Sequence, residues 1–386
     1  MSSNQVEFSN QPVVIDNGSA IIKAGFAGQD QPSSIFPSLI GNPKYKKVIG
    51  SSVENDSSYF VGERIHDMRG ILKLKHPMTH GVVTHWDCME RVWNHTYELL
   101  KIQSSEHPVL LTDVPNNPRL HRERAAELFF ETYNAPALYF SIPAILSLYA
   151  SGKTTGIVLD SGDGVTHAVP VFEGFALPHA ITRIDIGGRD ITDHLSYLLR
   201  RGGYNFNTSA EREVVRTIKE KTCYVAFDPQ KEEEMRELDN TTSSKPVQTT
   251  YQLPDGNLID LGAEKFRAPE LLFHPDIIGD ESPGIHQCID TSIRKSDIDL
   301  RKTLYANIIL GGGSTLFTGF GERLLHEVKK LAPKDVKIKI TAPLERKYSA
   351  WIGGSILASL TTFKDLWVTA QEYEDEGASI LHRKIL

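Results

Sequence analysis

Cysteine is scarce in this chain. Its 386 residues include only three, Cys88, Cys223 and Cys288, and no two of them lie close together in the sequence. A disulfide-stabilised extracellular domain and a zinc site made of cysteine pairs both need closely spaced cysteines, so the sequence argues against both. We expect the three thiols to be reduced and buried, as free cysteines usually are.

Long apolar runs and an excess of positive charge are also missing. No stretch approaches the ~18 consecutive apolar residues of a membrane helix, and residues 1–10 lack the basic and apolar runs of a targeting signal. Lys and Arg number 42 against 49 Asp and Glu, which gives a net charge of −7 and disfavours general binding to a phosphate backbone. We therefore expect a cytosolic protein that does not insert into membranes and does not use nucleic acid as its main partner.

The composition and the apolar pattern are typical of a soluble α/β protein. Hydrophobic residues make up 40% of the chain and charged residues 24%. Apolar strand patterns at 108–112 and 137–141 flank an amphipathic helical pattern at 118–134, and this alternation predicts an α/β fold. The length of 386 residues exceeds the roughly 250–300 at which single cores stop growing, so we expect at least two domains.

Two similar strand–turn–strand patterns lie 144 residues apart. Apolar residues 13–15 end at Asp16 before a turn of Asn, Gly and Ser, and apolar residues 157–159 end in the same way at Asp160. Each pattern predicts a β-hairpin. We interpret the repeat as an internal duplication that places two α/β halves on either side of a ligand cleft, with the first half ending near Ala150.

The chemistry of the two turns fits a nucleotide phosphate. Small residues allow main-chain N–H groups to approach phosphate oxygens, and Asp16 and Asp160 are suited to hold the water ligands of Mg²⁺. Lys23, on the strand after the first turn, can bind a phosphate oxygen as a point charge. Phosphoryl transfer to water also needs a group that orients the attacking water, and Asp160 and His167 are the candidates.

A third glycine-rich segment follows an apolar strand pattern at 306–311. Gly312 and Gly313 lead toward a helical pattern at 320–331, and glycines there allow a base or ribose to lie against the main chain. Other motifs fail, because residues 152–154 (GKT) lack the preceding glycine of a P-loop and no G-x-S-x-G or H-E-x-x-H occurs. The sequence therefore favours a nucleotide site without a Walker motif.

Two polar stretches interrupt the α/β pattern. Residues 42–59 are rich in turn formers, and residues 231–246 open with Lys and three Glu before a run of Asp, Asn, Thr and Ser. Both predict exposed surface loops, the first of them mobile. We interpret neither as a domain linker.

The three glycine-containing segments, in this order, resemble the phosphate 1, phosphate 2 and adenosine motifs shared by actin, sugar kinases and the seventy-kilodalton heat-shock chaperones. Longer runs are similar to the actin family almost letter for letter, namely 16–19 (DNGS), 23–28 (KAGFAG), 160–167 (DSGDGVTH) and 351–360 (WIGGSILASL). The similarity spans nearly the whole chain. It implies a duplicated actin/hexokinase/heat-shock-chaperone-type ATPase fold with two halves, four subdomains and a nucleotide cleft.

The resemblance also implies domain boundaries and a ligand. The outer half covers 1–150 with a small subdomain at about 38–76 and is completed by 348–386, and the inner half covers 151–347 with a subdomain at about 187–280. Residues 42–59 become the mobile loop that grips the next filament subunit, and His80 matches a histidine that senses the nucleotide. The implied cofactors are ATP or ADP and Mg²⁺.

The resemblance assigns phosphate, metal and nucleoside contacts to matching positions. Asp16 and Asp160, the predicted ligands of Mg²⁺ through water, and the catalytic candidates Asp160 and His167 lie within these motifs. The remaining contacts are Gly18, Ser19, Ala20 and Lys23 in the first turn, Asp163, Gly164, Val165 and Gly188 around the second, and Arg216, Lys219, Glu220, Gly312, Gly313, Ser314, Phe317 and Lys347 for the nucleoside.

Three positions depart from the actin pattern. Pro143 stands where the family has the glutamine that orients the attacking water, and proline has no side-chain donor or acceptor. Loss of such a group commonly lowers a rate by a factor of order 10²–10⁴, so we expect ATP binding with weak or slow hydrolysis. Ala20 adds a methyl group where the family has glycine, and residues 277–280 (IIGD) replace a more apolar plug, which predicts weaker lateral filament contacts.

Within the family, the chain is most similar to the centractin branch of actin-related proteins, which forms the short filament of dynactin. The runs 228–232 (DPQKE), 266–273 (FRAPELLF) and 319–325 (GFGERLL) carry this similarity. It implies that the chain polymerises with itself and binds other dynactin subunits, capping proteins, dynein and cargo adaptors. The implied role is microtubule-based transport and nuclear and spindle positioning, at the cytoplasmic cytoskeleton, cell cortex and spindle pole.

Other functions on the same scaffold make different demands. Conventional actin that supports myosin predicts an acidic N-terminus and the water-orienting glutamine, whereas residues 1–10 contain only Glu7 as an acidic residue and Pro143 replaces the glutamine. An ATP-dependent sugar kinase requires an acidic base and sugar-specific loops, which we do not identify. A nucleosome-remodelling actin-related subunit is a further alternative, although such chains usually depart more strongly at the phosphate turns.

Overall fold

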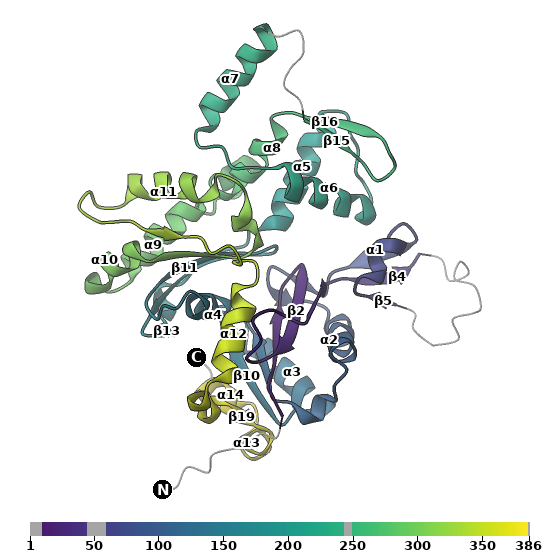
Figure 1. Cartoon of the computed structure of the whole chain (residues 1–386), viewed down its shortest axis with the longest axis vertical. Coiled ribbons are helices and arrows are strands. Elements are labelled where there is room, and N and C mark those ends of the chain that lie inside the picture. Colours follow the sequence, from purple (N-terminus) through teal and green to yellow (C-terminus); the bar gives the residue numbers. More distant parts are fainter. Residues whose placement is uncertain (1–9, 45–58, 243–248, 385–386) are drawn as a thin grey trace. The chain divides into compact units, whose positions relative to one another are not determined.

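The computed structural model describes residues 10–44, 59–242 and 249–384. The chain divides into two compact units, which we describe separately (Figure 1). Unit 1 comprises Met1–Val158, Val171–Ala176 and Pro343–Leu386, and unit 2 comprises Leu159–Pro170 and Leu177–Ala342. Most of the predicted loop at 42–59 lies outside the described residues.

Unit 1 is built on a six-stranded sheet in the order β19-β10-β9-β1-β2-β3. Its strands are β1 (Val13–Asn17), β2 (Ile21–Phe26), β3 (Ser34–Pro37), β9 (Val109–Thr112), β10 (Ala137–Ser141) and β19 (Val368–Thr369). The first two strands form the predicted hairpin, because β1 pairs with β2 in antiparallel register. β1 also pairs in parallel with β9, as expected for a strand that is apolar on both faces.

Helices and short strands complete unit 1. The helices are α1 (Arg64–Met68), α2 (Trp86–Leu100), α3 (Arg119–Glu127), α4 (Pro143–Ala150), α12 (Ser349–Ser359), α13 (Ala370–Glu376) and α14 (Ser379–Lys384). The short strands are β4 (Ile40–Pro43), β5 (Phe60–Val61), β6 (Leu72–Lys75), β7 (Met78–Thr79) and β8 (Val82–Val83). The helix predicted at 118–134 is α-helical only to Glu127 and continues as a π-helical turn, Leu128–Thr132.

Aromatic side chains and a close helix contact hold the core of unit 1 together. The rings of Trp93 and Phe129 lie 4.9 Å apart and are buried. α12 packs directly on α4 at Gly353, where a Cβ would overlap the carbonyl oxygen of Leu146. The indole of Trp351 donates a hydrogen bond of 3.0 Å to the carbonyl of Val14, which joins α12 to β1.

Unit 2 contains most of a second sheet, in the order β13-β12-β11-β17-β18, with β14 paired to β12. Its strands are β11 (Gly156–Ser161), β12 (Thr166–Phe172), β13 (Phe175–Ala176), β14 (Thr182–Ile184), β17 (Ile308–Gly311) and β18 (Ile340–Thr341). A separate hairpin is formed by β15 (Thr249–Gln252) and β16 (Leu258–Leu261). The helices are α5 (Gly188–Arg201), α6 (Ser209–Thr222), α7 (Pro229–Thr242), α8 (Glu264–Arg267), α9 (Ile285–Lys295), α10 (Ile298–Ala306) and α11 (Phe320–Leu331).

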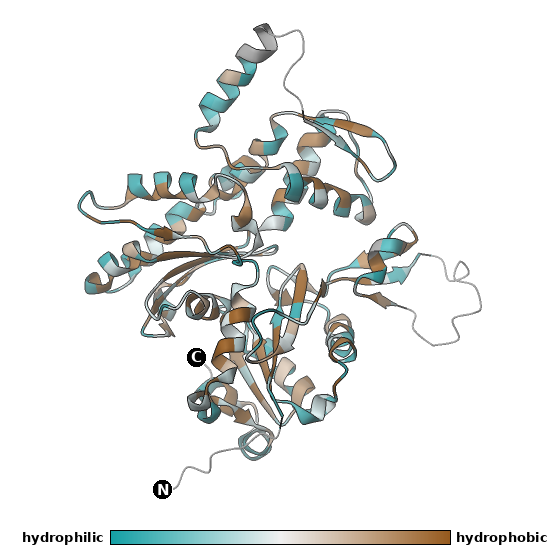
Figure 2. Ribbon diagram, in the orientation of Figure 1, coloured by the Kyte–Doolittle hydropathy of each residue, from teal (hydrophilic) through white to brown (hydrophobic). Residues whose placement is uncertain are grey.

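The prediction of a loop at 231–246 is wrong for residues 231–242, because they belong to α7. This helix is coloured largely hydrophilic in Figure 2 and has no apolar stripe that a sequence pattern would detect. Its first turns are held by side chains instead: the Tyr224 hydroxyl donates to Glu232 at 2.7 Å, and Arg267 pairs with Glu233 at 2.5 Å. The α/β class itself is confirmed by the two sheets and their covering helices.

Candidate functional site

The first turn joins β1 to β2 in unit 1. The Gly18 N–H donates to the carbonyl of Asp16 at 3.0 Å, and a Cβ at Gly18 would overlap the carbonyl oxygen of Ile21. Glycine is therefore required at position 18 for this turn to close. Ser19 and Ala20 complete the turn, and the carbonyl of Ala20 accepts a hydrogen bond from the Ser38 N–H at 2.8 Å.

The carboxylate of Asp16 is buried and both of its oxygens are engaged. Its Oδ2 lies 2.5 Å from Lys23 Nζ, and its Oδ1 accepts a hydrogen bond of 2.9 Å from the Thr112 hydroxyl. Asp16 and Lys23 face each other in the β1–β2 register, so the hairpin itself brings them together. A buried carboxylate beside a lysine provides the paired charges that a metal-bound phosphate requires.

The second turn joins β11 to β12 in unit 2. The Gly162 N–H donates to the carbonyl of Val165 at 3.0 Å, and the hydroxyls of Ser161 and Thr166 lie 2.8 Å apart in a buried position. This turn repeats the chemistry of the first, with Asp160 at the end of its strand. Asp163, Gly164 and Val165 lie in the turn itself.

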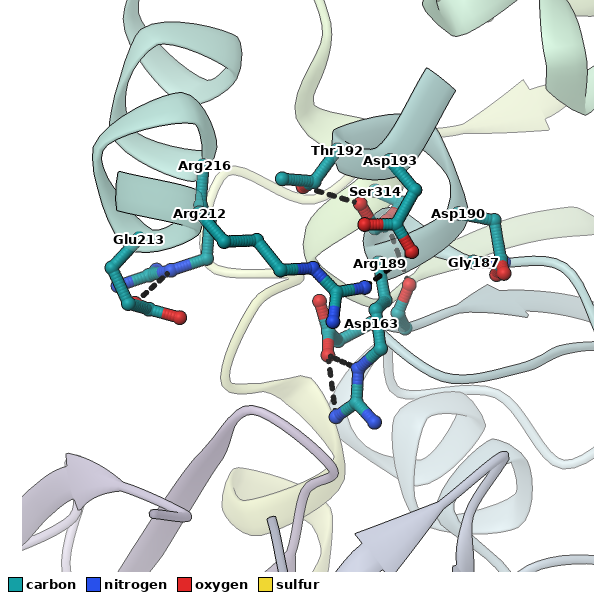
Figure 3. A network of polar contacts seen from close by, with 12 residues as sticks. Asp163, Gly187, Arg189, Asp190, Thr192, Asp193, Arg212, Glu213, Arg216 and Ser314 are labelled. Atoms are coloured by element: carbon teal, nitrogen blue, oxygen red, sulfur yellow. Dashed lines mark hydrogen bonds and ion pairs between the residues drawn. The ribbon is translucent and has the colours of Figure 1, made fainter. Parts of the chain in front are cut away.

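The start of α5 braces the second turn. The N–H groups of Gly188 and Arg189 donate to the carbonyls of Gly162 and Asp163 at 2.9 and 2.8 Å. The Arg189 guanidinium also pairs with the Asp163 carboxylate at 3.2 Å, as Figure 3 shows. A Cβ at Gly187 would come within 2.5 Å of the Asp163 carbonyl oxygen, so the helix approaches the turn as closely as a glycine permits.

The third glycine-rich segment lies against the same turn. Gly312 follows β17 with φ 82° and ψ 156°, a conformation that is essentially restricted to glycine. The next residues form a short 3-10 helix, Gly313–Leu316, followed by Phe317, and the hydroxyl of Ser314 donates to the Gly162 carbonyl at 2.7 Å. The structure therefore brings the second and third predicted segments together within unit 2.

α6 supplies charged side chains to this side of unit 2. Lys219 Nζ is buried and donates to the Gly188 carbonyl at 2.7 Å, and desolvation lowers the pKa of Lys219 although Asp163 opposes the shift. Arg216 binds Glu213 at 2.8 Å (Figure 3). It also binds Glu220 at 2.8 Å. Positions Lys219, Ser314 and Asp163 all surround Gly188, because a Cβ there would meet each of these side chains.

His167 lies on β12 opposite Arg183 in the β12–β14 register. Its side chain is buried, and its Nε2 has no hydrogen-bond partner in the described part of the chain. Burial lowers the pKa of His167 to about 3, with a further contribution from Arg183 that Asp185 opposes. At neutral pH the imidazole is therefore uncharged, so it can exchange hydrogen bonds with water but cannot act as an imidazolium acid.

Pro143 is the first residue of α4, where a missing N–H is tolerated. It lines a small cavity of about 40 Å³ in unit 1 together with Asn17, Thr112 and Asp113. Burial raises the pKa of the Asp113 carboxyl, and the adjacent Arg122 opposes the shift. The wall that Pro143 contributes offers no hydrogen-bonding group, as predicted from its side chain.

Several residues of these networks were not predicted from the sequence. Thr112, Asp113 and Arg189 join the predicted residues only through contacts across the fold. A signal did exist for Thr112 and Asp113, since they end an apolar strand as Asp16 does. Lys347 belongs to unit 1, whereas the other predicted nucleoside contacts belong to unit 2.

Each hairpin offers one hard carboxylate donor of the kind that Mg²⁺ prefers, Asp16 near the end of β1 in unit 1 and Asp160 near the end of β11 in unit 2. Within residues 10–44, 59–242 and 249–384 there is no group of three or more His, Cys, Asp or Glu side chains placed to hold a metal ion. None of the helices in these ranges combines the length and apolar character needed to cross a bilayer.

A mixed α/β chain with two equivalent strand–turn–strand units, each ending its first strand in an aspartate, belongs to the class of duplicated α/β proteins with phosphate-type turns. The sequence profile described as "Actin" matches residues 8–386. The chain is also 56% identical over 377 residues to an "Actin-like protein" of Neurospora crassa, covering 97% of this chain and 98% of that protein. The chain therefore belongs to the actin family and has the duplicated actin ATPase fold. Members of this family bind nucleotide with a divalent metal, and actin-like proteins generally self-associate into filaments.

Proposed function

We propose that this protein is a centractin-like, ATP-binding filament subunit that forms the short filament of dynactin and links dynein to cargo. The observation that carries the proposal is the combination of two strand–turn–strand units, each with an aspartate near the end of its first strand, and Pro143 at the start of α4. The turns retain the groups needed to bind a nucleotide, whereas the cavity wall at Pro143 lacks a group to orient water. Assembly is then the main function and hydrolysis is secondary.

In this proposal, different residues of the chain bind the phosphate, the metal and the nucleoside. The proposed phosphate contacts are Lys23, Gly18, Ser19 and Ala20 of the first hairpin, and Asp163, Gly164 and Val165 of the second. Asp16 and Asp160 hold the water ligands of Mg²⁺, which when bound would neutralise phosphate charge. Gly188 belongs with the second turn, and the proposed nucleoside contacts are Arg216, Lys219, Glu220, Gly312, Gly313, Ser314, Phe317 and Lys347.

We attribute slow turnover of ATP to the side chains available to orient and deprotonate the attacking water. Asp160 and the neutral His167 are the remaining residues that orient this water, and Asp160 is the better proton acceptor because burial lowers the pKa of His167 to about 3. Pro143 contributes neither function. The nucleotide therefore acts mainly as a structural ligand that sets the conformation of the subunit in the filament.

The proposed partners are further copies of the chain, other dynactin subunits, capping proteins, dynein and cargo adaptors. The proposed location is the cytoplasmic cytoskeleton, including microtubules, the cell cortex and the spindle pole. A conventional actin-like polymer is the alternative, supported by the same family membership. The sugar-kinase alternative has no residue of this chain that specifically favours it.

Purification of the tagged chain at its natural level, followed by electron microscopy and identification of its partners, tests this role. The proposal predicts particles with a short filament of uniform length that contain dynactin subunits. Long filaments of variable length that bind myosin would instead identify a conventional actin-like polymer. Monomers associated with chromatin would also contradict the proposal.

A further inference from the structure

Positive charge gathers at one end of unit 2. Residues 294–302 and 329–339 contain nine Lys and Arg against three Asp, a net charge of +6 in a chain whose net charge is −7. The two segments meet in the fold, because the guanidinium of Arg294 at the end of α9 donates to the carbonyl of Leu331 at the end of α11 at 3.2 Å. Figure 1 shows α9, α10 and α11 on one side of unit 2, and we call these two segments the basic end.

The arginines and the lysines of the basic end differ in what they contact. Arg301 donates to the carbonyls of Ser296 and Arg294 at 3.1 and 2.6 Å, so both arginines bind main-chain carbonyls near helix ends. Lys330 pairs with Glu327 at 2.9 Å. Within the described part of the chain, the other lysines of the basic end are exposed and form no ion pair or side-chain hydrogen bond: Lys295, Lys302, Lys329, Lys334, Lys337 and Lys339. Their charges are therefore available to a partner.

An anionic lipid bilayer fits these charges better than a defined acidic peptide does. A lysine ammonium is a flexible point charge, whereas fixed recognition of a carboxylate usually employs the planar fork of arginine. Both arginines here are already engaged. Ile298, which is 74% exposed at the start of α10, lies between these cations in the sequence. An exposed apolar side chain among basic residues is typical of a surface that rests on lipid headgroups.

The negative charge of the rest of the chain does not prevent this attraction. At physiological ionic strength the Debye length is about 8 Å, so charges that lie further away are largely screened. Each Lys or Arg close to an anionic bilayer strengthens binding about fivefold. The acidic residues of the basic end, Asp297, Asp299 and Asp335, reduce its positive charge without cancelling it.

We propose that the basic end of unit 2 binds the surface of an anionic lipid bilayer. The lysines attract the headgroups, and the chain rests on the membrane without spanning it. This inference goes beyond the proposed nucleotide binding and filament formation and does not depend on them. Vesicle binding by a chain that forms no filament would support this inference while contradicting the proposed function.

Flotation with lipid vesicles tests the proposal, because filaments alone do not float. The full chain is mixed with vesicles of phosphatidylcholine alone or with roughly 30% phosphatidylserine added. Lys295→Gln combined with Lys302→Gln removes two charges of the basic end and keeps polar side chains. The matched control combines Lys73→Gln with Lys75→Gln, at two exposed lysines of β6 in unit 1, and gives the same change in net charge.

We expect the chain to bind vesicles that contain phosphatidylserine and not those of phosphatidylcholine alone. The pair of substitutions in the basic end should weaken this binding by at least about tenfold, and the control pair should change it by less than about twofold. Lys329→Gln combined with Lys334→Gln is a second test pair, with the same expected loss, if the first disturbs folding.

Three results would overturn the inference. The first is equal weakening by the test and control pairs, which would show that only the net charge of the chain matters. The second is equal binding to both kinds of vesicle. The third is displacement from the vesicles by poly-glutamate at an equal concentration of negative charge, which would assign the basic end to an acidic protein partner.

Discussion

Burial determines the chemistry of His167. The side chain is 3% exposed, and its pKa of about 3 lies well below the ordinary value of 6.5. The folded protein therefore resists protonation of this residue, whereas the unfolded chain does not. Between these two pKa values the unfolded state binds more protons, so the folded state loses stability as the pH falls from 6.5 toward 3.

Replacement of His167 by glutamine should remove this acid sensitivity. We compare how far the free energy of unfolding falls between pH 6.5 and pH 4.0. We expect this fall to be roughly 3 kcal/mol smaller for His167→Gln than for the unmodified protein. Chemical denaturation at a series of pH values measures the difference. His326→Gln is the control, at a partly exposed histidine whose ring lies 4.8 Å from that of Phe227, and it should follow the unmodified protein. Identical pH profiles for all three proteins would show that His167 is readily protonated in the fold.

Site residues that belong to one local motif could be predicted from the sequence. Asp16 and Lys23 belong to one hairpin, so their proximity follows from the β1–β2 register. Thr112 contacts Asp16 across 96 residues of sequence, and this contact depends on the parallel pairing of β9 with β1. A single sequence does not specify which strands pair, so the contact between Thr112 and Asp16 could not be predicted from it.

At the scale of elements, the turn after β17 shows how backbone conformation constrains the third predicted segment. Gly312 has a positive φ, and a Cβ there would overlap the Ser161 carbonyl oxygen and approach Asp160 Oδ1 to 2.7 Å. Gly313, the next residue, has no atom within 4 Å of the equivalent position. Position 312 therefore requires glycine, whereas position 313 has room for a side chain.

Alanine substitutions at these two positions should have different effects on stability. We expect Gly312→Ala to lower the free energy of unfolding by about 2–3 kcal/mol, since both the conformation and the contact oppose a side chain. Gly313→Ala should change it by less than about 1 kcal/mol. Denaturant titration of both variants gives the comparison. Equal effects would mean that the turn adopts another conformation in solution.

α7 is the element that sequence periodicity failed to predict. Its residues are good helix formers, but they are polar on all sides, so no apolar stripe indicated a helix. The contacts that support it come from Tyr224 and Arg267, which lie outside the helix. By contrast, α11 carries an amphipathic pattern, and its bounds, Phe320–Leu331, agree with the prediction.

A proline in the middle of α7 distinguishes a helix from a loop. Met235 is 65% exposed, so its replacement removes little packing. We expect Met235→Pro to break the helix at a cost of about 3 kcal/mol to local stability and to increase deuterium uptake across 229–242. Met235→Ala, which preserves the helix, should leave the uptake unchanged. Similar uptake in both variants would support the loop that the sequence predicted.

At the scale of the whole molecule, the α/β class and the repeated hairpins could be predicted because each depends on local patterns. The set of strands that pair in each sheet could not be predicted, because each sheet joins segments that are distant in the sequence. For example, β10 pairs with β19, which places Leu138 opposite Val368. The actin family was identified from motif similarity, and the profile match and the relative in Neurospora crassa support that membership over nearly the full chain.

The slow turnover attributed to Pro143 is the central claim about function. Pro143→Gln restores the side chain that actin uses to orient water, and the cavity beside it has room for a small number of water molecules. Pro143→Ala is the control, because it removes the proline without adding a hydrogen-bonding group. The comparison therefore separates the effect of glutamine from the effect of losing proline.

The most direct measurement is single-turnover release of phosphate from bound ATP during polymerisation, with the particles imaged in parallel. We predict that the unmodified protein binds ATP, forms short filaments and releases phosphate at least about 10²-fold more slowly than Pro143→Gln, with Pro143→Ala as slow as the unmodified protein. Rapid release by the unmodified protein would contradict this account. It would show that another group, such as His167 with Asp160, orients the water without the glutamine.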